Sequence, residues 1–517
     1  MSASTERKLR QAARAAGTDK KTLAAQEEAA RKKKSNRRWT LGTIAVVLLI
    51  AAILFLDSGY FYTHTTALTI GDESYSPAEV NYRYANEYFT LVNQYGSYAS
   101  MFGLNTSSGI AGLSKSSCPM LEDGTWKDYF LQTATTEMEQ TKALTDYAKA
   151  NGIELDSDEI AAIDESVADL DAYAKQQGYS SASNLLGANY GNGVTTAIMR
   201  EAGLASSLAT KAYTTYSDSL TYSADQLEEY YQSLEGSRDY FDFLVYDVTA
   251  AVEDDGDDTT TDAPTEQALA EAHADAEAVL MAYTDGEEDI EDVQERFEVA
   301  VDSQFEGEAP TVRSSVLGSS LSESYSAWLK DAAREEGDVT VVDTETGSTV
   351  VVFLSRNDNH YATANIRHIL VMAEASEDGT YSDEAKAAAK ERAEEILAEF
   401  KAGDQTEESF AALAEQYSED SGSNTNGGLY ENVPQGQMVE EFDNFLFEGH
   451  KSGDTGIVYG ESSSYAGYHV MYFVGEGEQY SDVIAENALK TDDLNTWLED
   501  LVSGYEAVKG SGYRWIG

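Results

Sequence analysis

Cysteine and histidine are both scarce in this chain of 517 residues, which has one cysteine and six histidines. One thiol cannot form a disulfide within the chain, so no disulfide framework supports the fold. We interpret Cys118 as a packed structural thiol. Because histidine is rare here, two of the six are conspicuous: His368 and His469 each lie in a strand-like segment. Whether they form one site is the question that the other sequence features address.

Positive charge is scarce as well. The chain has 35 lysines and arginines against 92 aspartates and glutamates, a formal charge of −57. The imbalance is uneven, since residues 1–38 hold 12 cations and 4 anions and so carry +8, which leaves −65 on the remainder. A body this acidic repels nucleic acid and anionic membrane surfaces. We therefore predict no nucleic-acid partner.

A long uncharged segment is the clearest feature near the N-terminus. Residues 39–56 carry no charge and as a helix would reach about 27 Å, close to the thickness of bilayer hydrocarbon. The basic block at residues 31–38 favours the cytoplasmic side. We predict a transmembrane signal anchor at residues 39–57, a basic cytoplasmic tail at residues 1–38 and an extracellular bulk. A cleaved signal peptide is the weaker alternative, because its apolar region is usually about 7–15 residues long and no good cleavage site follows here.

The remainder is too long for one ordinary domain, and its length suggests about three domains. Residues 60–236 are predicted to be mainly helical. One helix is expected to begin at Pro77, with Ser76 as its cap and Glu79 completing a capping box. Residues 478–517 contain an amphipathic helix that is too short to be stable alone, so we expect it to pack on the helical region.

Two later segments repeat one order of elements, which indicates an internal duplication. Residues 238–356 and residues 364–477 each contain a strand, two helices and a closing strand. This order predicts α+β units in which helices pack on a small antiparallel sheet. The acidic stretch that follows the first strand of the earlier copy lacks the spaced oxygen ligands of a calcium loop.

The two copies differ where the histidines lie. Matching the apolar triplets of their first strands places Asp242 at the position of His368. Thr349 falls in the same way on His469. The joint loss of both imidazoles from the earlier copy suggests that the two histidines belong to one site.

Several ordered motifs identify the later copy: IRHILV, FAALAEQYSED, GGLYENVPQGQMVEEFDNFLF and GYHVMYF. Residues 364–477 resemble the parvulin family of peptidyl-prolyl isomerases, and the wider layout resembles the extracytoplasmic foldases of the PrsA and SurA kind. The resemblance implies an α+β fold class with an N-terminal transmembrane helix and a helical SurA-like chaperone domain at residues 60–236. It further implies two parvulin-like modules, the first of them (residues 238–356) degenerate, and a C-terminal helix (residues 478–517) that docks on the helical domain.

The same resemblance implies the site residues position by position. His368 and His469 match the paired histidines of the parvulin centre, and Asp420 matches a position where the family has Cys or Asp. These three are the candidate catalytic residues. The candidate proline pocket consists of Tyr430, Met438, Phe442, Ser464 and Ala466. The family signature GGDLG reads GGLYE here, with Tyr430 at the leucine position, so the pocket departs from the family pattern.

These residue types suit rotation about a prolyl bond. The barrier is about 18–20 kcal/mol because twisting removes amide resonance, and a catalyst need only favour the twisted state. Met438 and Phe442 can supply an apolar pocket, while the histidines and Asp420 can form a polar surround. No nucleophile, cofactor or metal is required. A zinc site made by His368, His469 and Asp420 is the alternative by residue type, and the family context disfavours it.

The leading functional hypothesis is a membrane-anchored extracytoplasmic peptidyl-prolyl cis-trans isomerase and chaperone that assists the folding of exported proteins. Its partners would be unfolded or partly folded polypeptides with X-Pro bonds, and the cytoplasmic membrane would hold residues 39–57. The resemblance implies an envelope of the Gram-positive type. One alternative is a catalytically weak or inactive holdase that uses parvulin-like folds as a binding scaffold. A second is a structural envelope protein that binds a single cell-wall partner.

Overall fold

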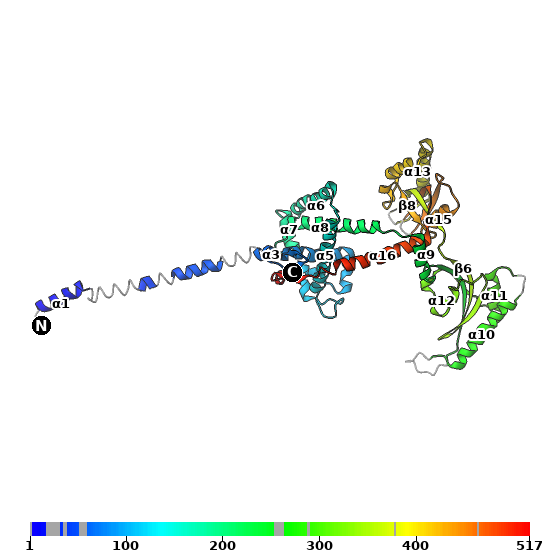
Figure 1. Ribbon diagram of the computed structural model, residues 1–517, viewed down its shortest axis with the longest axis horizontal. Coiled ribbons are helices and arrows are strands. Elements are labelled where there is room, and N and C mark those ends of the chain that lie inside the picture. The colour runs from blue at the N-terminus through cyan, green and yellow to red at the C-terminus, as the bar shows by residue number, and fades with distance from the viewer. Residues whose placement is uncertain are drawn as a thin grey trace. The chain divides into compact units, whose positions relative to one another are not determined.

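The computed structural model describes residues 3–16, 31–34, 39–50, 59–252, 263–286, 290–376, 379–462 and 465–517. The chain divides into two compact units (Figure 1). The first consists of Met1–Leu220 with Asp493–Gly517, and the second of Thr221–Asp492.

The first unit is mainly helical. Its elements are α1 (Ala3–Ala15), α3 (Tyr60–His64), β1 (Leu68–Ile70), β2 (Glu73–Tyr75), α4 (Pro77–Tyr95), η1 (Gly96–Phe102), η2 (Thr106–Ser108), η3 (Ile110–Lys115), α5 (Trp126–Ala150), α6 (Ser157–Gln176), α7 (Ala182–Tyr190), α8 (Thr196–Ser219), β11 (Val508–Lys509) and η6 (Tyr513–Trp515). Helix α4 begins with the predicted capping box, in which Ser76 and Glu79 each bond to the other's backbone N–H. Trp126, Tyr84 and Phe130 are the largest fully buried side chains of its core.

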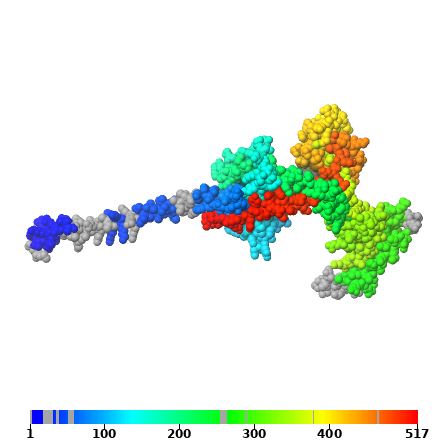
Figure 2. Space-filling model, viewed as in Figure 1, coloured from blue at the N-terminus to red at the C-terminus, as the bar shows by residue number. Residues whose placement is uncertain are grey.

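The last residues of the chain complete the first unit. Strand β11 pairs antiparallel with β1, with Leu68 opposite Lys509, and makes the third strand of the sheet β11-β1-β2. Trp497 stacks on Tyr216 with ring centroids 3.9 Å apart, and Ile516 is buried in the same core as β1. In Figure 2 the red C-terminal residues lie against the blue segment that contains β1.

The predicted transmembrane anchor falls partly within the part of the chain that the structure describes. Residues 39–50 are helical and exposed, while residues 51–57 of the predicted span lie outside the described residues. Among the helices that the structure describes, none combines the length and the apolar character needed to cross a membrane.

The second unit contains two four-stranded antiparallel sheets, in the orders β4-β3-β6-β5 and β8-β7-β10-β9. The first module is made of β3 (Tyr240–Thr249), α10 (Glu266–Asp285), α11 (Val293–Gln304), β4 (Thr311–Leu317), η4 (Gly318–Ser320), α12 (Glu323–Leu329), β5 (Val339–Thr344) and β6 (Gly347–Asn357). The second module is made of β7 (Ala362–Met372), α13 (Asp383–Ala402), α14 (Glu407–Tyr417), η5 (Asn424–Asn426), β8 (Leu429–Val433), α15 (Glu440–Phe447), β9 (Thr455–Glu461) and β10 (Ala466–Gln479). Figure 1 shows α10 and α11 along one face of the sheet that contains β6. The order of α-helices and strands, and the order of strands within the sheet, are the same in both modules, as a duplication requires.

Two helices flank these modules, α9 (Ala224–Ser233) and α16 (Tyr480–Val502). Leu227 and Tyr231 of α9 pack against Ala485 of α16 inside the second unit. The Tyr231 hydroxyl also donates to the buried carboxylate of Asp239 at 2.8 Å. The predicted helical region, residues 60–236, therefore does not coincide with the first unit. Its last helix, α9, lies beyond Leu220 and packs inside the second unit.

One shared turn fixes how the two modules superpose. The backbone N–H of Gly337 donates to the carbonyl of Phe353 at 2.8 Å, and that of Gly453 donates to Phe473 at 2.9 Å. Phe353 of β6 therefore corresponds to Phe473 of β10.

This correspondence corrects one predicted alignment. In the first module Phe353 pairs with Phe243 across the strands, and in the second Phe473 pairs with Ile366, so Phe243 corresponds to Ile366. Two residues further along, His368 corresponds to Val245, so the prediction that Asp242 occupies its position is wrong. Matching the apolar triplets sets the two strands three residues out of register, because Phe243, Leu244 and Val245 correspond to Ile366, Arg367 and His368 in the folded modules.

The other predicted replacement is confirmed. Counting four residues back from the paired phenylalanines places Thr349 at the position of His469. The Thr349 hydroxyl donates to Asp247 at 2.6 Å. The first module thus carries a valine and a threonine where the second carries two imidazoles.

Candidate active site

Strands β7 and β10 bring the two conspicuous histidines together. They pair antiparallel, with His469 opposite Leu370 and His368 opposite Met471, so the histidines are diagonal neighbours and lie on the same face of the sheet. Their Nδ1 atoms are 3.0 Å apart and their ring centroids 5.2 Å apart.

Asp420 extends this pair from the loop after α14. Its Oδ2 atom lies 2.9 Å from Nε2 of His368. The loop returns to β7 through Gly428, whose carbonyl accepts a hydrogen bond from the His368 backbone N–H at 2.9 Å. Gly428 has a φ of 71°, and a Cβ at this position would lie 2.2 Å from the His368 carbonyl oxygen. The glycine pair of the GGLYE motif therefore lets the loop approach the strand closely enough to place the carboxylate.

Two further polar side chains belong to the site, and neither was predicted. Ser423 is buried, donates to Asp420 Oδ2 at 2.6 Å and lies 3.2 Å from His368 Nε2. The Tyr465 hydroxyl lies 3.1 Å from Nε2 of His469. The sequence signals were weak: Ser423 follows Asp420 by three residues in a loop, and Tyr465 precedes His469 by four.

One assignment of protons with both rings neutral satisfies the whole chain of contacts. Because the Asp420 carboxylate can only accept, His368 donates through Nε2 and accepts at Nδ1. His469 then donates through Nδ1 and accepts the Tyr465 hydroxyl at Nε2. The hydrogen bonds all run one way, from Tyr465 through the two imidazoles to the carboxylate.

The electrostatics of the site agree with a neutral His469 and a charged Asp420. Burial, reinforced by His368, lowers the pKa of His469 to about 3. The hydrogen bond from His368 holds the pKa of Asp420 well below its ordinary value, with further help from Ser423 and the Gly422 N–H. At neutral pH the site therefore holds one carboxylate charge at one end of an uncharged His469.

The apolar side of the site comes from α15 and the loop before it. The ring of Phe442 meets both imidazoles edge-on, at centroid distances of 5.4 Å from His368 and 5.2 Å from His469. Met438 packs against the same cluster and is partly buried. The two residues predicted to line a proline pocket therefore both belong to the apolar cluster beside the imidazoles, and their contact with proline stays a prediction.

Tyr430 lies next to His368, with ring centroids 5.4 Å apart. Its hydroxyl donates to Asp420 Oδ2 at 3.0 Å. Burial, and then this hydrogen bond, raise the pKa of the phenol. The residue at the family's leucine position thus adds a third donor to the carboxylate oxygen that already receives His368 and Ser423.

Of the two remaining predicted pocket residues, the structure describes Ala466 but not Ser464. Ala466 is the first residue of β10 and is fully buried. Its carbonyl accepts the N–H of Ala373 at 2.8 Å, a contact that ties the start of β10 to the end of β7. Ser464 lies outside the described residues.

The side chains that a substrate can reach differ from those at the centre. His368, His469 and Phe442 are 4%, 5% and 2% exposed. Asp420 and Tyr430 are partly exposed, as are Met438 and Tyr465. A bound peptide would therefore touch the second group, with the imidazoles behind it.

The geometry also bears on the zinc alternative. His368 bonds to both His469 and Asp420, so the three potential ligands are engaged with one another. Among the described residues, no group of three or more His, Cys, Asp or Glu side chains is arranged to hold a metal ion.

Comparison with known proteins identifies the second module. Residues 349–474 match the family model of the PPIC-type PPIase domain. No curated protein is significantly similar in sequence to this chain.

Several solved structures are similar to parts of the chain. PrsA from Bacillus subtilis is 15% identical, with 74% of this chain and 87% of that chain covered and a TM-score of 0.28. The foldase PrsA from Streptococcus pneumoniae is 12% identical, with 74% and 88% covered and a TM-score of 0.23. The peptidylprolyl isomerase PrsA from Bacillus anthracis is 20% identical, with 28% and 59% covered and a TM-score of 0.18. The matched region spans less than two thirds of the PrsA chains from Bacillus anthracis and Bacillus cereus, 59% and 49%. The family model, rather than these low-scoring similarities, bears on function.

Proposed function

Because residues 349–474 form a PPIC-type, parvulin-like peptidyl-prolyl cis-trans isomerase domain, we propose that this chain isomerises X-Pro bonds in exported polypeptides and assists their folding. The observation that carries the proposal is the meeting of the two imidazoles. His368 and His469 approach to 3.0 Å, and Asp420 closes the network at 2.9 Å from His368. The isomerase module supplies catalysis in this proposal, and the helical first unit supplies binding of unfolded chains.

The proposal places the chain on the outer side of the cytoplasmic membrane, anchored through residues 39–57. Its support is in the sequence: an uncharged run long enough to span the hydrocarbon, a basic block before it, and an acidic remainder. Exported chains with X-Pro bonds would be the clients.

Catalysis by such a site requires no bond to be broken. The planar amide resists rotation by about 18–20 kcal/mol, so the site must bind the twisted amide more tightly than either planar form. The proline ring would rest against Met438, and the buried Phe442 would support this wall from behind. A twisted amide is less conjugated and less polar along its C–N bond, so a water-excluding wall stabilises it relative to the planar forms, which lose more hydration.

The two histidines act in this proposal as positioning residues. They are almost fully buried, and their protons are fixed by the chain of hydrogen bonds. Imidazoles fixed in this way behind the pocket keep the surface of Tyr465 and Asp420 in one arrangement, and the neutral His469 does so without adding a charge to be desolvated. The groups that contact substrate are those at the surface of the site.

The test is a prolyl-isomerisation assay on the full chain with a short proline-containing peptide. Met438→Ala removes the pocket wall and should lower kcat/KM at least about tenfold. Met281→Ala is the matched control, because Met281 is an exposed methionine on α10 in the first module, which lacks the paired histidines of the site. The catalytic proposal fails if Met438→Ala keeps full activity while both variants remain folded by circular dichroism.

A second candidate is a holdase with little or no isomerase activity. The observation that favours it is Tyr430, whose hydroxyl is held to Asp420 where the family has leucine. Tyr430→Leu separates the two candidates. For a working isomerase this variant should change kcat/KM by less than about tenfold, whereas a holdase blocked by the tyrosine should gain activity from a level near the uncatalysed rate.

A further inference from the structure

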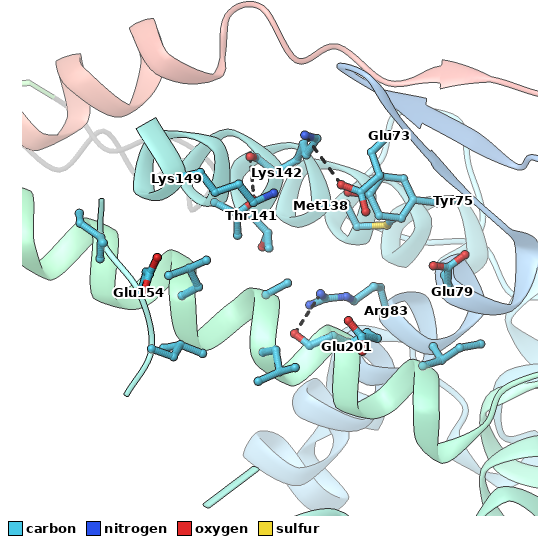
Figure 3. Close-up of a pocket in the computed structure, with 18 of the residues that line it drawn as sticks. Glu73, Tyr75, Glu79, Arg83, Met138, Thr141, Lys142, Lys149, Glu154 and Glu201 are labelled. Atoms are coloured by element: carbon cyan, nitrogen blue, oxygen red, sulfur yellow. Dashed lines mark hydrogen bonds and ion pairs between the residues drawn. The ribbon is translucent and has the colours of Figure 1, made fainter. Parts of the chain in front are cut away.

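The first unit contains a groove that the isomerase site does not use. It lies between α5 and α8, with α4 at one end and the loop 152–155 at the other, and has a volume of about 530 Å³ (Figure 3). Pockets that bind ligands in proteins typically measure about 300–1,000 Å³. The groove is therefore large enough to take several side chains of a peptide.

The walls of the groove are aliphatic. Seven of the lining residues are half-buried and apolar: Ile153, Leu155, Ile160, Ile198, Leu204, Ala205 and Leu208. They come from α6, α8 and the loop between α5 and α6, and none of them is aromatic. Half-buried aliphatic side chains gathered in one hollow leave apolar surface in water that a bound chain would cover.

The cationic side chains of the groove already have partners within the first unit. Arg83 is 14% exposed and donates to Glu137, to Ser206 and to the Ala202 carbonyl. In Figure 3 the Arg83 side chain reaches from α4 toward α8, where it closes one end.

The lysines of the lining are paired in the same way. Lys142 contacts both Asp72 and Asp146 at 2.7 Å, and Lys149 lies 3.7 Å from Asp146. Neither of these aspartates lines the groove. Lys142 also lies 3.8 Å from Glu73, a carboxylate of the lining, so acids inside and outside the lining cancel the positive charges.

The acids of the rim keep their negative charge. Glu154 and Glu201 are exposed at the edge of the groove. Glu154 forms no ion pair with any cation among the described residues, and Glu201 lies 3.7 Å from Arg200. Glu79 adds a third carboxylate, which caps α4. An occupant with positive charge beside its apolar part would complement this rim.

We propose that this groove binds extended segments of unfolded clients in which aliphatic side chains are flanked by lysine or arginine. The proposal rests on the chaperone role proposed above and names the substrate class of the first unit. The floor offers few free polar groups that would orient a small polar ligand, since the Arg83 guanidinium is already bonded. A formal charge of −57 on the chain also attracts cationic segments from a distance.

The test uses the full chain and three fluorescent peptides without proline. They share one core of leucine and isoleucine and differ in their flanks, which carry lysine, serine or glutamate. Anisotropy titrations at low salt should show the lysine-flanked peptide binding roughly tenfold more tightly than the glutamate-flanked one. The difference should shrink at high salt, because exposed charges are screened.

Two pairs of substitutions locate the effect. Glu154→Lys with Glu201→Lys should reverse the order of the peptides. Glu122→Lys with Glu165→Lys changes the net charge equally at exposed positions outside the lining and should preserve the order. If the two double variants behave alike, the proposal is overturned, because only long-range charge would then be at work.

A filling substitution tests the groove itself. Ala205→Phe places a ring among the aliphatic walls and should weaken all three peptides, with unchanged circular dichroism. Unchanged binding by this variant also overturns the proposal. Prolyl isomerisation is measured on the same preparations. If the wild type isomerises prolyl bonds but does not distinguish the three peptides, only the proposed groove is refuted. If it distinguishes the peptides but has no isomerase activity, only the catalytic part of the proposed function is refuted.

Discussion

The two imidazoles of the site occupy different surroundings, although their rings touch. His368 lies between the ionised Asp420 and the hydroxyl of Ser423. His469 has the edge of Phe442 and the hydroxyl of Tyr465 as its other neighbours. Burial, reinforced by His368 and only partly offset by the charge of Asp420, is why the pKa of His469 falls to about 3.

This lowered pKa makes the stability of the protein depend on pH. Between about pH 3 and 6.5 the unfolded chain binds a proton at His469 that the folded chain does not. The free energy of unfolding should therefore fall as the pH falls through this window, with a contribution from this residue of up to about 1.4 kcal/mol per pH unit. Above the window His469 is neutral in both states and contributes no slope.

His469→Asn isolates that contribution, since asparagine does not titrate. Urea unfolding of the wild type and the variant at pH 8, 7, 5.5 and 4.5 checks it. The stability difference between the two proteins should be constant from pH 8 to 7 and should narrow as the pH is lowered to 4.5. A difference that stays the same at all four pH values would contradict the assigned burial of a neutral imidazole.

At the scale of the elements, the loop from α14 to β8 decides whether the carboxylate reaches the strand. Gly428 and Gly436 both have positive φ angles, 71° and 76°. A Cβ at Gly428 would strike the His368 carbonyl, whereas one at Gly436 would meet nothing within 4 Å. Gly436 lies in the exposed turn after β8, so it shares the positive φ of Gly428 without the close approach to β7.

Substituting alanine at each glycine therefore separates strain from crowding. Gly436→Ala should cost about 1 kcal/mol, the penalty of a left-handed alanine. Gly428→Ala should cost several kcal/mol more and abolish isomerase activity, because the loop must move away from β7. Urea midpoints and the peptide assay measure both effects, and similar losses in the two variants would show that the close approach is unimportant.

Structural features encoded by neighbouring residues or by ordered family motifs could be predicted from the sequence, whereas features that depend on loop conformation could not. The capping box of Ser76 and Glu79 was predictable, since it is written within four residues. The pairing of His368 and His469 was predictable from ordered family motifs. Ser423 was not, because its orientation depends on a loop conformation that no periodicity records.

The alignment of the two modules shows a second limit. The apolar triplets of β3 and β7 match only when the strands are set three residues out of register, and the right register follows from the backbone bond between Gly337 and Phe353 that Gly453 and Phe473 repeat. The bulge next to Asp242 is likewise invisible in the residue pattern. Strand register depends on pairing between distant segments, and that pairing becomes evident only in the folded chain.

At the scale of the whole molecule, the two units have separate cores. Ile516 is 2% exposed in the core of the first unit, although it is the penultimate residue of the chain. Ile516→Asp would bury a carboxylate without a partner and should destabilise the first unit by several kcal/mol.

The same variant should leave isomerisation of short peptides nearly unchanged, because the site residues all lie in the second unit. Limited proteolysis reports on the first unit and the peptide assay on the second. Ile516→Val is the matched control and should behave as the wild type in both measurements. If Ile516→Asp makes the first unit sensitive to protease and also abolishes isomerisation of the short peptide, the two units depend on each other.

The pairing of β11 with β1 also determines the order in which the two units can finish folding during synthesis. The first unit is built from both ends of the chain, with residues 221–492 between them. A ribosome delivers the chain from its N-terminus, so both isomerase-like modules are released before the strand that finishes the helical unit. The first unit therefore cannot complete its fold until β11 and Ile516 have been synthesised. Until then one edge of β1 is unpaired and the core lacks the Ile516 side chain. By then the isomerase module has already had time to fold, so the catalytic part of this protein matures before the part proposed to hold its clients.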